Sequence, residues 1–313
     1  MNPQVVAAII AAGVSFLTLI GTLAAQYLGR RATSRDTQKA LEEQGKQLDR
    51  TLAEQRTRTL NERFATAAGQ LGSDKPSAVR LAGVYAMAGL ADDWEENRQT
   101  CVDVLCAYLR MPYEPDPGQD ASEPERLAFR ASREVRHTVI RVITAHLKDD
   151  ATMSWQGLNF DFTGAVFDGG DFSGAKFSGG TVYFIGAEFS GGTVYFIGAV
   201  FSGGTVYFNG AVFSGGTTRF RDAVFSGGTV SFDGAVFSGG GLDFDYAKFS
   251  SGEVHFDYAK FSGGTVRFRR AEFSGGEVHF SDPGDWSFPP AFPWTDTPPP
   301  GVKVPKKEDQ SQA

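Results

Sequence analysis

Histidines, aspartates and cysteines are the side chains in this sequence whose types could do chemistry. His255 and His279 occupy the same place in two copies of a short repeat, with one copy between them. If the repeats stack them on one face, two imidazoles would meet, and imidazole is a common ligand of divalent transition metals. They would need further ligands, and Ser231, the next residue in that column, adds no strong one. The spacing alone therefore predicts surface histidines and no metal site.

Other polar groups also favour structural roles. Asp161, Asp168 and Asp171 would point outward from different faces of the first repeats. We therefore expect a solvated surface there and not a carboxylate cluster. His137 and His146 lie nine residues apart, without Cys, Asp or Glu at ligand spacing. That pattern predicts ordinary surface or core histidines.

The two cysteines point to a reducing compartment. Cys101 and Cys106 lie five residues apart in an expected helix and lack a zinc-type set of partners, so we expect reduced core thiols. The sequence has no phosphate-binding loop, no Gly-x-Ser-x-Gly elbow and no His-Glu-x-x-His motif. We predict a protein that is not an enzyme and needs no cofactor or metal. An enzyme or effector whose activity lies in the helical region is the alternative.

The elements that position these groups are set by a phenylalanine repeat. A phenylalanine returns every twelve residues from Phe177 to Phe273, and a second one follows each of these seven residues later, ending at Phe280. A fixed short period indicates a solenoid, in which each repeat buries its apolar face against its neighbours. Near-identical repeats also leave few singular positions for catalysis.

A five-residue period precedes the twelve-residue one. Its phenylalanines are Phe162, Phe167, Phe172 and Phe177. The twelve-residue unit then divides into a pentapeptide, a two-residue insert and a second pentapeptide, as in residues 187–191, 192–193 and 194–198. Over about residues 155–281 this pattern resembles the pentapeptide-repeat family. The resemblance implies a right-handed quadrilateral β-helix with four pentapeptides in each coil.

The inserts are expected to bulge at alternate corners, so that one coil would consist of two twelve-residue units. Two columns of charge then form at the spacing of one coil: Arg219, Asp243 and Arg267, and Arg221, Asp245 and Arg269. Opposite charges would lie about 5 Å apart on neighbouring coils, as a ladder of exposed pairs worth little individually. A coil of a single unit would instead stack Arg219 on Ser231.

The amino-terminal segment predicts a membrane span. Residues 1–29 have no charged side chain, and an apolar run covers residues 5–25. As a helix this run would be about 32 Å long, which is about one bilayer core. Arg30 and Arg31 follow at once, so the positive-inside rule predicts a single-pass protein of the cell membrane with cytoplasmic carboxy-terminal domains. A cleaved signal and a buried soluble helix are the alternatives.

The rest of the chain completes an α+β protein. We expect a polar helical stalk at 30–59, a small helical domain at 60–150 with a capping box at Ser122-x-x-Glu125, the β-helix at 155–281, and a Pro-rich cap and disordered tail at 282–313. Parts of residues 60–110 resemble the helical segment that precedes the repeats in bacterial membrane-anchored pentapeptide-repeat proteins. The cap is expected to use Trp286, Phe288, Phe292 and Trp294.

Outward apolar side chains of the early coils are the best candidate for a protein-binding patch. They are Tyr183, Tyr195, Tyr207, Ile185 and Ile197. The alternative is that aromatic and β-branched residues merely suit strands.

Together these features predict a non-enzymatic, membrane-anchored scaffold that presents the β-helix to an unknown protein partner. Self-association through the membrane helix or the stalk is a further expectation. Some soluble members of the resembled family mimic DNA and bind DNA gyrase, which is the alternative function. It needs a long acidic face, and arginines interrupt the modest negative charge of residues 155–288. The net charge of -7 gives no reason to expect nucleic-acid binding.

Overall fold

The computed structural model describes residues 2–72 and 74–305, and the chain forms two compact units, Met1–Asn61 and Glu62–Ala313. Helix α1 (Pro3–Leu71) forms nearly all of the described part of the first unit, and its last turns, from Glu62 on, belong to the second unit. The expected span, stalk and first helix of the helical domain are thus parts of one helix. The boundary expected near residue 60 lies close to the division between the units, whereas the other helices and the repeats share one unit.

Three α-helices precede the repeats in the second unit. They are α2 (Ser77–Asp93), α3 (Arg98–Arg110) and α4 (Glu123–Leu147), and a 3₁₀ turn, η1 (Glu95–Asn97), separates the first two. The expected capping box opens α4: the Ser122 hydroxyl accepts the Glu125 N–H, and the Glu125 carboxylate accepts the Ser122 N–H at 2.9 Å. The apolar stripe of α3 is buried, including Val102 and Leu105, because it packs against α2 and α4.

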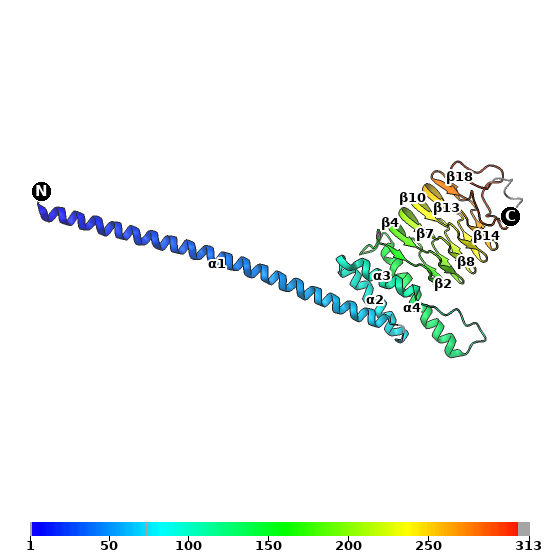
Figure 1. Ribbon diagram of the computed structural model, residues 1–313, viewed down its shortest axis with the longest axis horizontal. Coiled ribbons are helices and arrows are strands. Elements are labelled where there is room, and N and C mark those ends of the chain that lie inside the picture. Colours follow the sequence, from blue (N-terminus) through cyan, green and yellow to red (C-terminus); the bar gives the residue numbers. More distant parts are fainter. Residues whose placement is uncertain (1, 73, 306–313) are drawn as a thin grey trace. The chain divides into compact units, whose positions relative to one another are not determined.

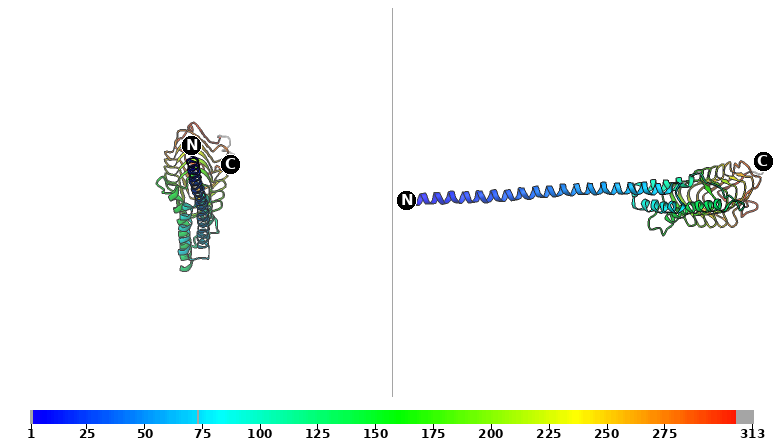
Figure 2. Two further views of the ribbon diagram at one scale, coloured as in Figure 1. Left: turned by 90° about the vertical axis from the view of Figure 1, so that its left-hand side faces the viewer. Right: turned by 90° about the horizontal axis from the view of Figure 1, so that it is seen from below.

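From residue 160 to 303 the chain forms a β-solenoid of about six turns. Its coils are seen as a stack of parallel strands in Figure 1 and from two other sides in Figure 2. Sheet A contains β1 (Phe160–Asp161), β4 (Lys176–Tyr183), β7 (Val200–Tyr207), β10 (Val224–Ser231), β13 (Lys248–His255), β16 (Glu272–Phe273), β17 (Glu277–His279) and β18 (Val302–Lys303). Sheet B contains β2 (Val166–Phe167), β5 (Glu188–Phe189), β8 (Val212–Phe213), β11 (Val236–Phe237) and β14 (Lys260–Phe261). Sheet C contains β3 (Gly170–Asp171), β6 (Thr193–Tyr195), β9 (Thr217–Arg219), β12 (Gly241–Asp243) and β15 (Thr265–Arg267).

The strand register confirms that one coil consists of two twelve-residue units. Phe177 pairs with Phe201, and Asp243 lies between Arg219 and Arg267 in sheet C. In sheet A one long strand of each coil contains the end of one pentapeptide, an insert and the start of the next pentapeptide. The strand register shifts at the insert, which is the expected bulge. The lead-in has no insert, so the first coil is shorter there, and Phe160 pairs with Val182.

Phenylalanine columns fill the solenoid axis. Phe208 is fully buried, and its ring centroid lies 4.6 Å from those of Phe184 and Phe232 on the neighbouring coils. This spacing is close to the distance of about 4.7–4.9 Å between paired strands, so the backbone register itself stacks the rings. Rings from adjacent faces meet edge to face, as Phe208 and Phe220 do at 5.9 Å. Alanine columns such as Ala211 and Ala235 fill the remaining space and are also fully buried.

The Pro-rich segment closes the carboxyl end, as expected. Trp286 packs edge to face on Phe261 at 5.1 Å, and Phe292 stacks on Phe268 at 5.6 Å. Phe288 was expected in this cap but is 55% exposed. The solenoid also extends beyond its expected end at residue 281, because β18 pairs with β17. The tail expected to be disordered beyond residue 304 falls mainly on residues 306–313, outside the described residues.

Candidate functional site

The five residues of the predicted patch do not form one surface. Tyr183 pairs with Tyr207 in sheet A, and their rings stack at 5.7 Å between centroids. Tyr195 lies half a coil away in sheet C, where it pairs with Arg219. Because each twelve-residue unit is half of a coil, every second copy of the repeat faces the other side.

The two halves of the patch also differ in character. Ile185 follows Tyr183 and is 39% exposed, so it extends the apolar surface of the tyrosine pair. The guanidinium of Arg219 lies 5.8 Å from the ring centroid of Tyr195. That half is therefore covered in part by a cation, and Ile197 beside it is half-buried. The pair of Tyr183 and Tyr207 with Ile185, called the tyrosine face below, is the more apolar candidate.

The charge columns are less exposed than expected. Arg267 binds Asp243 at 3.4 Å and Arg269 binds Asp245 at 3.2 Å, but both aspartates are buried. The Asp245 carboxylate also accepts the backbone N–H of Arg269 at 3.0 Å. The ladder expected to be solvated therefore holds neighbouring coils together through nearly buried carboxylates.

A polar cluster joins α4 to the first coil. Asp168 accepts hydrogen bonds from Tyr113 at 2.8 Å and from Arg133 at 2.9 Å, and its Oδ1 lies 3.1 Å from His137 Nε2. Burial alone would raise the pKa of Asp168, but His137, Tyr113 and Arg133 together lower it to about 2. Burial and the Asp168 carboxylate raise the pKa of Tyr113. The surface expected to be solvated is, at Asp168, an internal ion-pair cluster.

The other expected groups near this end also have structural partners. Asp161 forms an ion pair with Arg110 at 2.6 Å. His146 stacks on the buried Trp155 at 3.9 Å between ring centroids, and Asp92 bonds to both rings. The sequence did not indicate these pairs, because the bonds to Asp161 and Asp92 join segments that are distant along the chain.

Side chains of α4 also donate hydrogen bonds to backbone carbonyl groups at the amino end of the solenoid. Arg136 donates to the carbonyl of Val166 at 2.8 Å, and Thr144 donates to that of Asp171 at 2.9 Å. These bonds satisfy carbonyl groups of strands at the open end, where further pairing would otherwise be available to another chain. Figure 1 shows the helices beside this end of the stack.

A shallow polar hollow of about 760 Å³ lies beside the cluster. Arg126, Arg130 and Arg133 line it together with Asp116 and Asp168. Three cations against two carboxylates leave one excess positive charge, and Arg133 is already bound to Asp168. The hollow is part of the junction between the helices and the coils.

The cysteines and the paired histidines complete the set of candidate groups. Burial raises the pKa of Cys101 to about 11 and that of Cys106 to about 12. Both thiols are free, buried and protonated at neutral pH, so they are inert core residues. His255 and His279 do stack, at 4.7 Å between ring centroids, and the structure brings Asp257 beside them.

Residues 162–206 and 203–248 match the family described as pentapeptide repeats (9 copies). Together with the stacked coils, this match identifies residues 162–248 as a pentapeptide-repeat solenoid, a fold that supports a repeat protein involved in protein interaction. No curated protein and no solved structure matches the chain.

Proposed function

We propose that this is a single-pass membrane protein that holds a pentapeptide-repeat solenoid at the cytoplasmic face to bind a protein partner. The anchor rests on the helical segment Pro3–Gly29, whose most apolar 18-residue window has a mean hydropathy of 2.3 and is not buried. Ile9, Leu17 and other apolar side chains lie exposed around this helix. A helix that is apolar on all sides needs lipid or another protein around it.

The orientation rests on charge next to the apolar segment. Arg30 and Arg31 follow it in the sequence, and no charged side chain precedes it. The positive-inside rule then favours a cytoplasmic solenoid. The two reduced, buried cysteines are compatible with that compartment.

The binding surface we favour is the tyrosine face. Stacked tyrosines offer a large contact area at low entropic cost, and tyrosine is enriched at protein interfaces. The solenoid core fixes the positions of Tyr183 and Tyr207 because the residue after each of them, Phe184 and Phe208, is fully buried. A non-catalytic role fits a fold whose repeated side chains serve mainly to build the stack.

The DNA-mimicking alternative has less support. A mimic of DNA needs free carboxylates along one face. Asp243 and Asp245 are instead buried and bound to Arg267 and Arg269. The tyrosine face is uncharged.

Fractionation tests the anchor. The full chain should remain in the membrane pellet after alkaline carbonate extraction, and an Ile9→Lys/Leu17→Lys variant should be extracted. A cysteine introduced by Ser202→Cys tests the orientation, because the native thiols are buried and give little background. An impermeant maleimide should label it only after the cells are permeabilised. Extraction of the wild-type protein would remove the anchor from the proposal.

Crosslinking tests the tyrosine face. A photo-crosslinking amino acid at position 183 or 207 should give a discrete adduct, and the same group at position 195, on the other side of the coil, is the matched control. The Tyr183→Ala/Tyr207→Ala variant should lose the partner and remain folded, because both tyrosines are only half-buried and the buried rings of Phe184 and Phe208 stay in place. Equal adducts from positions 183 and 195, or none from either, would refute a binding role for this face.

A further inference from the structure

A short motif occurs twice at the spacing of one coil. Glu253-Val254-His255 ends β13, and residues 277–279, Glu-Val-His, form β17. The two strands pair in register, with His255 opposite His279. Residues two apart on a strand share a face, so the glutamates and histidines of both coils project from one surface.

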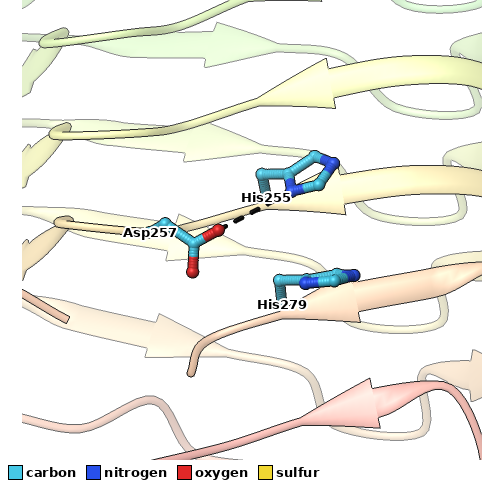
Figure 3. Close-up of side chains that lie close together, drawn as sticks. All are labelled: His255, Asp257 and His279. Carbon is cyan, nitrogen blue, oxygen red and sulfur yellow. Dashed lines mark ion pairs between the residues drawn. The ribbon is translucent and has the colours of Figure 1, made fainter. Parts of the chain in front are cut away.

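The structure adds a carboxylate to the two imidazoles. Asp257 follows β13, and its Oδ2 atom lies 3.7 Å from Nδ1 of His255. One donor atom from each of His255, Asp257 and His279 lies within 4.8 Å of the others. Figure 3 shows one oxygen of the Asp257 carboxylate directed at His255, with His279 on the neighbouring strand. All three residues are half-buried, so the site is partly shielded and still reachable from solvent.

A second layer of side chains orients the imidazoles. Nε2 of His255 lies 3.0 Å from the Glu253 carboxylate, and Nε2 of His279 lies 2.8 Å from that of Glu277. A neutral imidazole that donates its Nε2–H to a carboxylate has its lone pair on Nδ1. Carboxylate–histidine pairs of this kind are the usual outer shell of metal-binding histidines.

The Nδ1 atoms are the remaining nitrogens of these rings. The 3.7 Å separation between Nδ1 of His255 and Asp257 is too long for a good hydrogen bond. The Ser281 hydroxyl lies 3.5 Å from the Asp257 carboxylate. Lys303, one coil further on, binds Glu277 at 2.9 Å and so offsets part of the negative charge of the outer layer.

We propose that Nδ1 of His255, Nδ1 of His279 and the carboxylate of Asp257 bind a divalent transition-metal ion of the zinc type. Imidazole nitrogens favour such ions over Mg²⁺ or Ca²⁺, which prefer oxygen ligands. Bonds of about 2.0–2.1 Å in a tetrahedron bring donor atoms to about 3.3 Å from one another, so small side-chain rotations close the site. Water supplies the fourth ligand. The ion joins two adjacent coils near the carboxyl end of the solenoid.

Calorimetry on the untagged, detergent-solubilised full chain tests the site directly. After removal of metal with EDTA and dialysis, titration with ZnCl₂ should saturate at one ion per chain. His279→Gln and Asp257→Asn should each weaken binding by at least about tenfold, and Glu253→Gln by about 10- to 100-fold through the outer layer. Ser231→Ala, in the same column one coil earlier, is the matched control and should bind as the wild type does.

Two readouts separate metal binding from folding. In EDTA the variants should melt within about 3 °C of the wild type. Excess Zn²⁺ should raise the melting temperature of the wild type and of Ser231→Ala by about 5 °C, and that of the histidine and Asp257 variants by much less. Co²⁺ should give the visible spectrum of tetrahedral coordination in the wild type and lose it in His255→Gln. Absence of saturable binding, or equal affinity in the wild type and both histidine variants, would overturn the proposal. If one variant fails to fold, the others decide the outcome.

Discussion

The glycine of each two-residue insert should be the least replaceable position on the solenoid surface. A Cβ atom added at Gly216 would lie 2.1 Å from the carbonyl oxygen of Gly192 on the preceding coil. That oxygen accepts the N–H of Thr217 at 2.9 Å. Gly216→Ala must therefore push two coils apart at a point where a backbone hydrogen bond holds them. The residue also has φ of +63°, which L-residues rarely adopt.

The expected cost follows from these two effects. The left-handed conformation alone costs an alanine about 1 kcal/mol. Opening the contact by about 1 Å breaks the hydrogen bond from the Thr217 N–H to the Gly192 carbonyl at this partly exposed corner, which adds about 0.5–1.5 kcal/mol. We expect Gly216→Ala to lower the free energy of unfolding by about 1.5–2.5 kcal/mol.

A second glycine in the same part of the chain is the matched control. Gly210 has φ of +62°, but an added Cβ there meets no atom within 4 Å. Gly210→Ala should therefore cost only the conformational strain of about 1 kcal/mol. The sequence supports this small cost, because non-glycine residues already adopt the same conformation at the equivalent corner of later units. They are Asp222 and Tyr246, with φ of 56° and 62°.

Urea denaturation of the detergent-solubilised full chain measures the difference. Trp155 at the amino end and Trp286 at the carboxyl end are buried or packed on phenylalanine rings, so tryptophan fluorescence reports unfolding of both ends. With a slope of about 2 kcal/mol per M, the midpoint should fall by about 0.8–1.3 M for Gly216→Ala and by about 0.5 M for Gly210→Ala. Equal shifts for the two variants would refute the argument from the close approach of the coils.

Two further predictions concern charged groups. Asp245→Ala should cost about 2 kcal/mol, because it removes the acceptor of the Arg269 N–H and leaves the guanidinium unpaired. Arg269→Ala, which removes an exposed side chain, should cost no more than about 1 kcal/mol in the same urea assay; a larger loss for Arg269→Ala than for Asp245→Ala would contradict this. The pKa of Asp168 is about 2 in the folded protein, against an ordinary value of 3.8. The ionised carboxylate therefore stabilises the folded state by up to about 2 kcal/mol above about pH 4. This stabilisation is lost as the pH falls toward 2. Asp168→Asn should remove that part of the pH dependence, measured as the urea midpoint between pH 2 and 5, and an unchanged profile would show that the cluster does not act this way.

The period of the sequence was sufficient to predict the coil. Two phenylalanines in each twelve-residue unit, with Arg219 and Asp243 placed two units apart, indicated coils of two units, and the register confirms this. The capping box at Ser122 was equally readable because it depends on neighbours in the sequence. Such features need only local rules and one assumption about stacking.

Contacts that depend on docking were not predictable from the sequence. Asp168 meets Arg133 and His137 only because α4 lies across the first coil. Asp257 joins the histidines because the chain turns a corner directly after β13, and the direction of its side chain is set by that corner. The predicted tyrosine patch failed to form one surface for a simpler reason. A strict twelve-residue repeat conceals that alternate copies face opposite ways.

The half-coil offset also governs how a protein of this design can change its length. Insertion of one twelve-residue unit would place the later strands of sheet A against the earlier strands of sheets B and C, so the side-chain columns would no longer continue across the insertion. Insertion of two units would restore each column, with Arg over Asp and phenylalanine over phenylalanine. Gene duplication can therefore lengthen this solenoid only by whole coils, in pairs of units, although its sequence repeats with every single unit.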